Sequence, residues 1–281
     1  TPGTTGPVDS GDQSQVSLAV SFTDPGTLDT HNVTWDWGDG TSSDPVGNEA
    51  SGVSQSHTYS ATGIYQVTVT VTDKDEGVDT DSYQYFVVYD PDGGFVTGGG
   101  WINSPAGAYL ADTGHSGKLH FGFNAKYKNN AALPTGQTQS QLQGTTLKLH
   151  SISYDWLVVA APFAFFQGTG SLDGAGSYDF LISVMDEESD PAQDEDRFRL
   201  QIWDSTGALV YDNEMGRDLY ADPLTELGKG NIALHQVSGA SLNVETPLLI
   251  VGSPPAELIA RLEGSHETSG FVNIFLPTLN R

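Results

Sequence analysis

The chain has 281 residues, with 36 Asp and Glu against 11 Lys and Arg and a formal net charge of −25 at pH 7. This charge repels nucleic-acid phosphates and anionic lipid surfaces, and no run of about 18 apolar residues occurs, so neither nucleic-acid binding nor membrane insertion is expected. The absence of cysteine excludes disulfides, thiol catalysis and thiolate-bound zinc.

The charge is distributed unevenly along the chain. Residues 1–92 contain 15 acidic residues and one basic residue, and residues 162–281 contain 19 acidic and six basic residues. Residues 93–161 contain two acidic residues and four lysines, which gives this part a net charge of +2. Acid enrichment is common in secreted and in salt-adapted proteins, whereas the basic middle part forms either an ordinary solvated surface or a face toward an acidic neighbour.

The first part of the chain has the pattern of a small β-domain. Residues 1–14 are rich in Thr, Pro, Gly, Ser and Asp, which predicts a linker or N-terminal arm. Apolar and polar residues then alternate with a period of two, as in half-buried strands, and no helical period occurs in the first 90 residues. The predicted strands are 16–22, 33–37, 65–72 and 83–89. Short strands separated by turns predict an immunoglobulin-like β-sandwich at residues 15–92.

Three separated motifs in this region occur in order. They are Trp-Asp-Trp-Gly-Asp-Gly at 35–40, Ser-His-Thr-Tyr at 56–59 and Gly-Ile-Tyr-Gln-Val-Thr-Val-Thr-Val-Thr-Asp at 63–73. Together they resemble the PKD domain family, with its W-D-F-G-D-G, H-x-Y and G-x-Y-x-V-x-V-x-V-x-D motifs; Trp37 stands where Phe is usual. The resemblance covers about residues 12–90. It implies a β-sandwich module of extracellular and cell-surface proteins, with a spacer or binding role rather than catalysis.

Residues 93–281 are predicted to form a larger antiparallel β-sandwich, which makes the protein all-β. The strand signals lie at 119–123, 146–150, 155–159, 178–184, 198–203, 209–211, 248–251 and 271–276, and 256–262 fits a strand or a helical turn. Motifs within 94–213 also resemble a module that often follows PKD domains in bacterial surface and secreted proteins. They include Gly-Gly-Gly-Trp-Ile at 98–102, Asp-Arg-Phe-Arg at 196–199 and Tyr-Asp-Asn at 211–213. This resemblance implies a location and no particular chemistry.

An acidic segment at residues 186–196 lies between two apolar strands and contains seven acidic residues in eleven. Carboxylates this close repel one another, so either their pKa values rise or a hard cation neutralises them. Ca²⁺, which takes about six to eight oxygen ligands, is such a cation. The segment predicts a calcium site or a solvated acidic loop, with Mg²⁺ binding or catalysis as lesser alternatives. The candidate ligands are Asp186, Glu188, Asp190, Asp194 and Asp196, with Asp212 at the end of a neighbouring strand.

Two further sets of candidate residues follow from the sequence. The PKD resemblance implies that Asp24 and Asp29 lie in a loop where some PKD domains bind calcium. Trp101, Trp156 and Trp203 are either exposed platforms for sugar rings or members of the core. Neither H-E-x-x-H nor G-x-S-x-G occurs, so no catalytic residue is predicted and the protein is not expected to be an enzyme.

The sequence therefore predicts a noncatalytic structural or adhesive module, extracellular or at the cell surface and stabilised by Ca²⁺. Its expected partners are other extracellular proteins, copies of itself or surface polymers. One alternative is a subunit of an extracellular filament or surface layer, assembled through strand addition or charge pairing. The other is a carbohydrate-binding accessory module of a secreted hydrolase.

Overall fold

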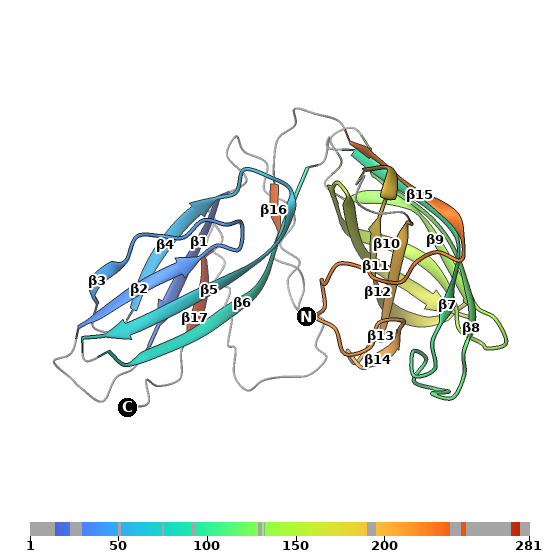
Figure 1. The fold of residues 1–281 in the computed structure, drawn as a ribbon, viewed down its shortest axis with the longest axis horizontal. Helices are drawn as coiled ribbons and strands as arrows, with labels where there is room; N and C mark the ends of the chain where they lie inside the picture. The colour runs from blue at the N-terminus through green and yellow to red at the C-terminus, as the bar shows by residue number, and fades with distance from the viewer. Residues whose placement is uncertain are drawn as a thin grey trace. The chain divides into compact units, whose positions relative to one another are not determined.

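A computed structural model of the chain shows an all-β protein, as the sequence predicts (Figure 1). In the part that the structure describes, the only helical element is the three-residue 3-10 helix η1 (Glu187–Ser189). No described helix has the length and apolar character that crossing a membrane requires. The described residues are 15–22, 30–49, 52–74, 76–90, 94–128, 131, 133–189, 195–236, 243–245 and 271–275.

The described strands divide between two units, and the first unit consists of two sheets. One sheet has three strands in the order β17-β1-β4, and the other has five in the order β16-β6-β5-β2-β3. The strands are β1 (Gln15–Ser21), β2 (His31–Asp36), β3 (Val46–Glu49), β4 (Gly52–Thr58), β5 (Gly63–Asp73), β6 (Val78–Tyr89), β16 (Asn243–Glu245) and β17 (Phe271–Phe275). The predicted immunoglobulin-like sandwich is therefore present.

Two strands from the end of the chain belong to this first unit. β17 pairs in parallel with β1, from the Ser17–Phe271 pair to the Ser21–Phe275 pair. β16 lies beside β6 at the edge of the other sheet. The sequence-based boundary assigned all of residues 93–281 to the second domain, and the structure differs from it at these two strands. The apolar pattern of β17 predicts a strand, but the pattern does not specify which sheet edge that strand joins.

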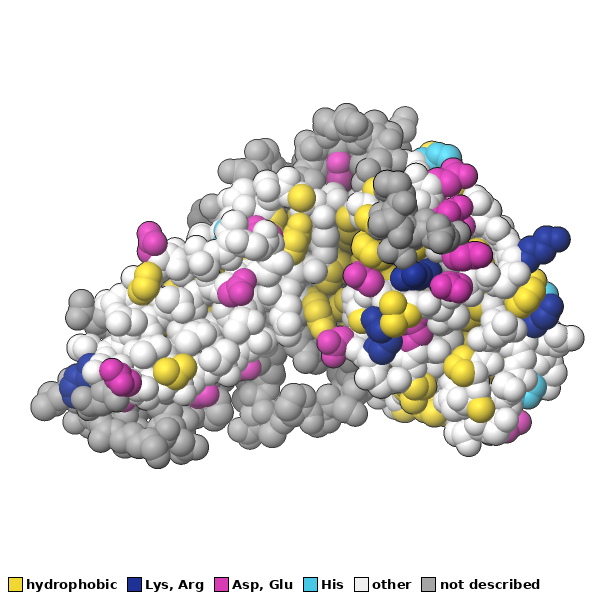
Figure 2. Space-filling view, viewed as in Figure 1, with side chains coloured by type: hydrophobic (Ala, Val, Ile, Leu, Met, Phe, Trp, Pro, Cys, Tyr) yellow, Lys and Arg dark blue, Asp and Glu magenta, His cyan; other side chains and the backbone are white. Residues whose placement is uncertain are grey.

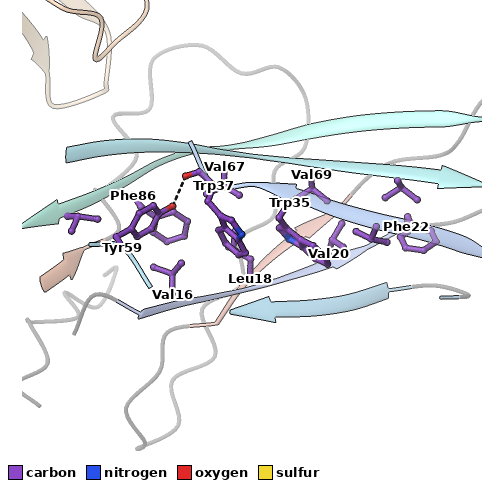
Figure 3. Packing of buried hydrophobic residues seen from close by; sticks show 13 residues of the cluster. Val16, Leu18, Val20, Phe22, Trp35, Trp37, Tyr59, Val67, Val69 and Phe86 are labelled. Atoms are coloured by element: carbon purple, nitrogen blue, oxygen red, sulfur yellow. Dashed lines mark hydrogen bonds between the residues drawn. The ribbon is translucent and has the colours of Figure 1, made fainter. Parts of the chain in front are cut away.

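The core of the first unit lies between its two sheets. Alternate residues of β1, β2 and β5 are buried, as their period-two pattern predicts. Figure 3 shows Leu18 and Val20 of β1 facing Trp35 of β2 and Trp37 just after it. The two tryptophan rings stack with centroids 6.5 Å apart. Burial of two indole rings contributes a large share of the apolar area that stabilises a sandwich of this size.

The second unit is one nine-stranded antiparallel sheet, strongly curled into a half-barrel. Its order is β14-β13-β12-β11-β10-β9-β8-β7-β15, so β7 to β14 form an up-and-down meander and β15 returns beside β7. The predicted antiparallel pairing is confirmed, but a single curled sheet takes the place of two stacked sheets. The strands are β7 (Gly94–Ser104), β8 (Gly117–Tyr127), β9 (Pro134–Leu142), β10 (Lys148–Ala160), β11 (Phe163–Leu172), β12 (Ala175–Met185), β13 (Arg197–Asp204), β14 (Leu209–Asp212) and β15 (Lys229–Gln236).

The concave face of the curled sheet holds the second core. Phe121 of β8 and Phe198 of β13 stack with ring centroids 3.9 Å apart, although four strands separate β8 from β13 in the sheet. Phe123 contacts Phe166 of β11 in the same interior, at 5.2 Å. Because these rings meet across the curl, burying them holds the sheet in its curved form.

Candidate functional site

The acidic segment begins and ends with two buried carboxylates, Asp186 and Asp196, which are 3% and 6% exposed. One oxygen of each accepts a backbone N–H inside the segment. Asp186 Oδ1 accepts from Glu188 at 3.0 Å, and Asp196 Oδ1 accepts from Glu187 at 3.0 Å. These bonds fix the turn that leads from β12 into β13, and they orient both carboxylates toward the protein.

The second oxygen of each carboxylate reaches the edge strand β15. Asp196 Oδ2 accepts the Ile232 N–H at 2.6 Å, and Asp186 Oδ2 accepts the Leu234 N–H at 2.8 Å. An edge strand otherwise presents unpaired N–H groups, whose burial is costly. The two carboxylates, here called the carboxylate clamp, therefore join the β12–β13 turn to β15 across the open side of the half-barrel.

The rest of the acidic segment keeps the electrostatic character that the sequence predicts. Desolvation and the neighbouring carboxylates, Asp196 first among them, raise the pKa of Glu187. Among the described residues, no three His, Cys, Asp or Glu side chains form a group that could hold a metal ion. The described carboxylates therefore do not by themselves fit a calcium site. Asp190 and Asp194, and likewise Asp24 and Asp29, lie outside the described residues, and calcium binding there stays a prediction.

Asp212, the remaining calcium candidate, lies in a buried ion pair. Arg199 of β13 is 0% exposed, and its Nε and Nη2 donate to the two carboxylate oxygens of Asp212 at 3.1 and 2.8 Å. The Arg199 Nη1 also donates to the backbone oxygen of Asp218 at 2.7 Å. The guanidinium already compensates the charge of Asp212, so the role that the structure shows for this carboxylate is to hold Arg199.

Two residues next to Asp212, not identified from the sequence as functional, extend this network. Asn213 Oδ1 accepts the Leu200 N–H at 2.7 Å, and its Nδ2 donates to the Phe198 oxygen at 3.1 Å. Glu214 Oε1 accepts the Thr225 N–H at 2.7 Å. These bonds hold residues 213–228 against β13. The Asp-Arg-Phe-Arg motif at 196–199 and the Tyr-Asp-Asn motif at 211–213 contain members of this network.

An open groove of about 470 Å³ lies on the outer face of β8, β9 and β10. Exposed and buried residues alternate along β8 and β9, so every second side chain faces this groove. Gly122 forms part of its floor, where an added Cβ would meet no atom within 4 Å. The polar side chains that line the groove are His120, Asn124, Gln137, Gln139, Gln141, Lys148 and His150.

Strand pairing arranges these side chains in rows. His120, Gln141 and Lys148 are cross-strand neighbours in one row. Gly122, Gln139 and His150 form the next row, so the glycine leaves a gap between longer side chains.

The lining of the groove and the strands β7, β8 and β9 lack acidic residues. None of the residues that line the groove is Asp or Glu, and β7, β8 and β9 contain neither, although the whole chain has 36. Lys118 and Lys126 are exposed on β8 in the same alternation as His120. Figure 2 shows Lys or Arg and His side chains along the margin of this unit where β8 and β9 lie in Figure 1. The face is locally basic on a strongly acidic protein.

Comparison with known proteins identifies the first unit. Residues 2–88 match the family model of the PKD domain. The N-terminal region is a PKD domain. The match ends before β7, so the nine-stranded unit lies outside it. No curated protein and no solved structure matches the chain.

The motif residues of the PKD domain have structural roles in the described geometry. Asp39 Oδ1 accepts the Thr41 N–H at 3.0 Å, and Asp39 Oδ2 lies 2.8 Å from His57 Nε2. The His57 ring stacks on Trp37, and the Tyr59 hydroxyl donates to the Trp37 oxygen at 3.0 Å (Figure 3). The first two motifs thus fix the turn after β2 against β4.

The three tryptophans proposed as sugar platforms do not offer free faces. Trp156 and Trp203 are 1% and 5% exposed, so both belong to the core. Trp101 is half-buried, and Lys118 Nζ lies 3.6 Å from the centroid of its ring. The ring edge packs so closely on Gly228 that an added Cβ there would overlap it. Trp101 therefore positions a lysine by a cation–π contact instead of presenting a bare ring.

Proposed function

We propose that this chain is a noncatalytic adhesive module of an extracellular or surface protein, and that it binds its partner through the groove on β8, β9 and β10. PKD domains usually occur in extracellular and surface proteins, which supports the location. The observation that carries the binding role is the groove itself, whose volume of about 470 Å³ lies in the range of ligand sites. It is lined by hydrogen-bonding side chains on rigid strands.

The chemistry of the lining favours binding over catalysis. Amide side chains such as Gln139 and Gln141 donate and accept hydrogen bonds but do not exchange protons near neutral pH. His120 and His150 have no carboxylate among the lining residues to orient them, which a histidine general base usually has. A groove of this composition recognises a polar surface and leaves it unchanged.

Binding to a panel of immobilised extracellular polymers tests this proposal. Gly122→Val fills the floor of the groove without changing its charge, and we expect it to reduce binding at least tenfold. Gly114→Val is the matched control, because a Cβ at Gly114 would meet only Asp112 Oδ1 at 3.7 Å and Gly114 does not line the groove. Equal binding by Gly122→Val and the wild type would refute the role of the groove, and turnover of any polymer would refute the noncatalytic assignment.

Calcium stabilisation is a second proposal, supported by the repulsion that acts on Glu187. If Asp190 and Asp194 bind Ca²⁺ in the folded state alone, Ca²⁺ at 100 times its Kd stabilises the fold by about 2.7 kcal/mol. We expect EDTA to lower the melting temperature of the wild-type protein by several degrees. The double variant Asp190→Asn/Asp194→Asn should then melt identically with Ca²⁺ or EDTA. If neither Ca²⁺ nor EDTA changes the melting temperature of the wild-type protein, this calcium site is ruled out.

A further inference from the structure

We infer that the ligand of the groove is an anionic polysaccharide, an inference that rests on the proposed binding role of this face. Its repeating unit would carry hydroxyl groups together with a carboxylate or a sulfate ester. Three features of the described residues specify this class: the amide-rich lining, the local positive charge and the open floor.

The amide side chains match the hydroxyl groups of a sugar. Asn124, Gln137, Gln139 and Gln141 line the groove, and each carries one acceptor oxygen and two N–H donors. A sugar hydroxyl also donates and accepts, so an amide satisfies it in either direction. Four such side chains on neighbouring strands provide the repeated bidirectional hydrogen bonding that a polyhydroxylated chain requires.

The positive charge of the groove face favours an anionic ligand. Lys148 lines the groove, and Lys118 and Lys126 extend from the same face of β8. The cation–π contact with Trp101 limits the freedom of Lys118, which lowers the entropy lost when it binds an anion. No carboxylate lines the groove to compete for these cations. A neutral polysaccharide has no anionic group that could form an ion pair with these lysines.

The net charge of −25 on the whole chain limits which anionic polymers can bind to the groove. At about 0.15 M salt the Debye length is about 8 Å, so distant carboxylates act weakly on a ligand held in the groove. The overall charge disfavours very dense polyanions such as nucleic acids, whereas a polysaccharide with spaced charges meets mainly the local lysines. A second copy of this chain brings the same strong negative charge and is disfavoured for that reason.

The open floor suits an internal segment of a polymer. Gly122 leaves the groove clear at the β8 end of the row formed with Gln139 and His150. Gly99, its neighbour on β7, has no side chain either, and a Cβ there would make only ordinary contacts beyond 3.6 Å with the backbone of β8. A sugar ring can therefore approach the backbone of two adjacent strands without displacing any side chain.

Binding of the full chain to four labelled polymers in 150 mM NaCl tests the ligand class. Polygalacturonate carries carboxylates, dextran sulfate carries sulfate esters, dextran is neutral, and poly-L-glutamate is anionic without hydroxyl groups. We expect at least one acidic polysaccharide to bind tenfold or more tightly than dextran and poly-L-glutamate. The tighter binder of polygalacturonate and dextran sulfate then shows whether the anionic group of the ligand is a carboxylate or a sulfate ester.

Four variants separate the contributions to the affinity. We expect Lys148→Gln to weaken binding of the acidic polysaccharide about tenfold and to reduce its salt dependence. Lys74→Gln removes the same charge in the PKD domain and should leave Kd unchanged. Gln139→Leu should weaken polysaccharide binding about fivefold, and Gly122→Val should weaken it at least tenfold. The circular dichroism and melting temperature of each variant verify folding.

The outcomes distinguish this inference from the proposed function. If poly-L-glutamate binds as tightly as the acidic polysaccharides, or if dextran binds more tightly than they do, the inferred ligand class is wrong. If Gly122→Val weakens that binding, the groove is still a binding site. Failure of both acidic polysaccharides to bind also overturns the ligand class. Binding that Gly122→Val does not affect overturns the groove and the proposed function together.

Discussion

Asp155 of β10 and Asp179 of β12 form an unusual carboxylate pair in the second unit. Burial, with a smaller contribution from the charge of Asp179, raises the pKa of Asp155, and burial raises the pKa of Asp179. Gln167 of β11 lies between their strands and donates from Nε2 to Asp155 Oδ2 at 3.5 Å. Keeping both side chains charged at neutral pH therefore destabilises the fold.

The pH dependence follows from the direction of these shifts. A carboxyl group whose pKa is raised in the folded state costs no stability below its ordinary value of 3.8, because it is then protonated in both states. The cost develops as the pH rises from this ordinary value to the raised folded value, and it is complete above the folded value. We expect Asp155→Asn to raise the melting temperature by a few degrees at pH 7 and to have no stabilising effect near pH 3. Asp112→Asn, at an exposed position, is the control, and an equal rise in it would contradict this account.

Substitution in the carboxylate clamp is expected to have the opposite effect and to lower the stability of the fold. Asp196→Ala removes the acceptor of the Glu187 and Ile232 N–H groups. Hydrogen bonds to charged groups contribute roughly 1.5–3 kcal/mol each, so we expect a loss of about 3 kcal/mol in the free energy of unfolding. Urea denaturation in EDTA measures it without any contribution from calcium. Glu195→Ala, at an exposed neighbouring position, should change stability by less than about 0.5 kcal/mol; similar losses in both variants would show that the clamp does not stabilise the fold.

At the scale of elements, β17 completes a sheet that the PKD motifs alone leave with two strands. It covers the edge of β1 through the five residue pairs from Ser17–Phe271 to Ser21–Phe275. An uncovered strand edge exposes backbone hydrogen-bonding groups and invites pairing with another chain. The C-terminal segment thus serves the first unit, although 181 residues lie between β6 and β17 in the sequence.

Removal of residues 271–281 tests the role of β17. We expect the PKD domain to melt at least about 5 °C lower, because this unit loses one ladder of its smaller sheet. The transition of the nine-stranded unit should not change. Hydrogen exchange at Ala19 and its neighbours in β1 should accelerate, and Asn273→Pro, which removes one N–H from the ladder, should produce a smaller effect. Unchanged exchange in β1 would show that the pairing does not form in solution.

At the scale of the whole molecule, most of the negative charge lies in parts of the sequence other than the segment that forms the groove. Of the 36 acidic residues, 34 lie in residues 1–92 and 162–281, while β7, β8 and β9 contain none. An acidic surface keeps copies of the protein apart and in solution. Lys118, Lys126 and Lys148 still attract an anion that comes close to them, because salt screens most of the field of the distant carboxylates.

Local patterns account for the parts of the fold that were predicted correctly. Period-two alternation marks β1, β2 and β5, and the Trp-Asp-Trp-Gly-Asp-Gly motif at 35–40 identifies the PKD domain, because both signals lie within one strand and its turn. The candidate site was predicted less well. The sequence identified Asp186 and Asp196 as members of an acidic segment and as candidate calcium ligands, but it did not show that their oxygens accept the N–H groups of Leu234 and Ile232. The groove was not predicted.

The sequence by itself determined that the protein is all-β, that its N-terminal region resembles the PKD domain family and that residues 93–161 carry a net charge of +2. Each of these properties depends on residue types and on spacings shorter than a domain. Only the tertiary structure decided that the second unit is one curled sheet, that β17 pairs with β1, and that Gly122 of β8 lies opposite Gln139 of β9. These features depend on the pairing of strands that are distant in sequence, and an alternating pattern carries no information about the partner of a strand.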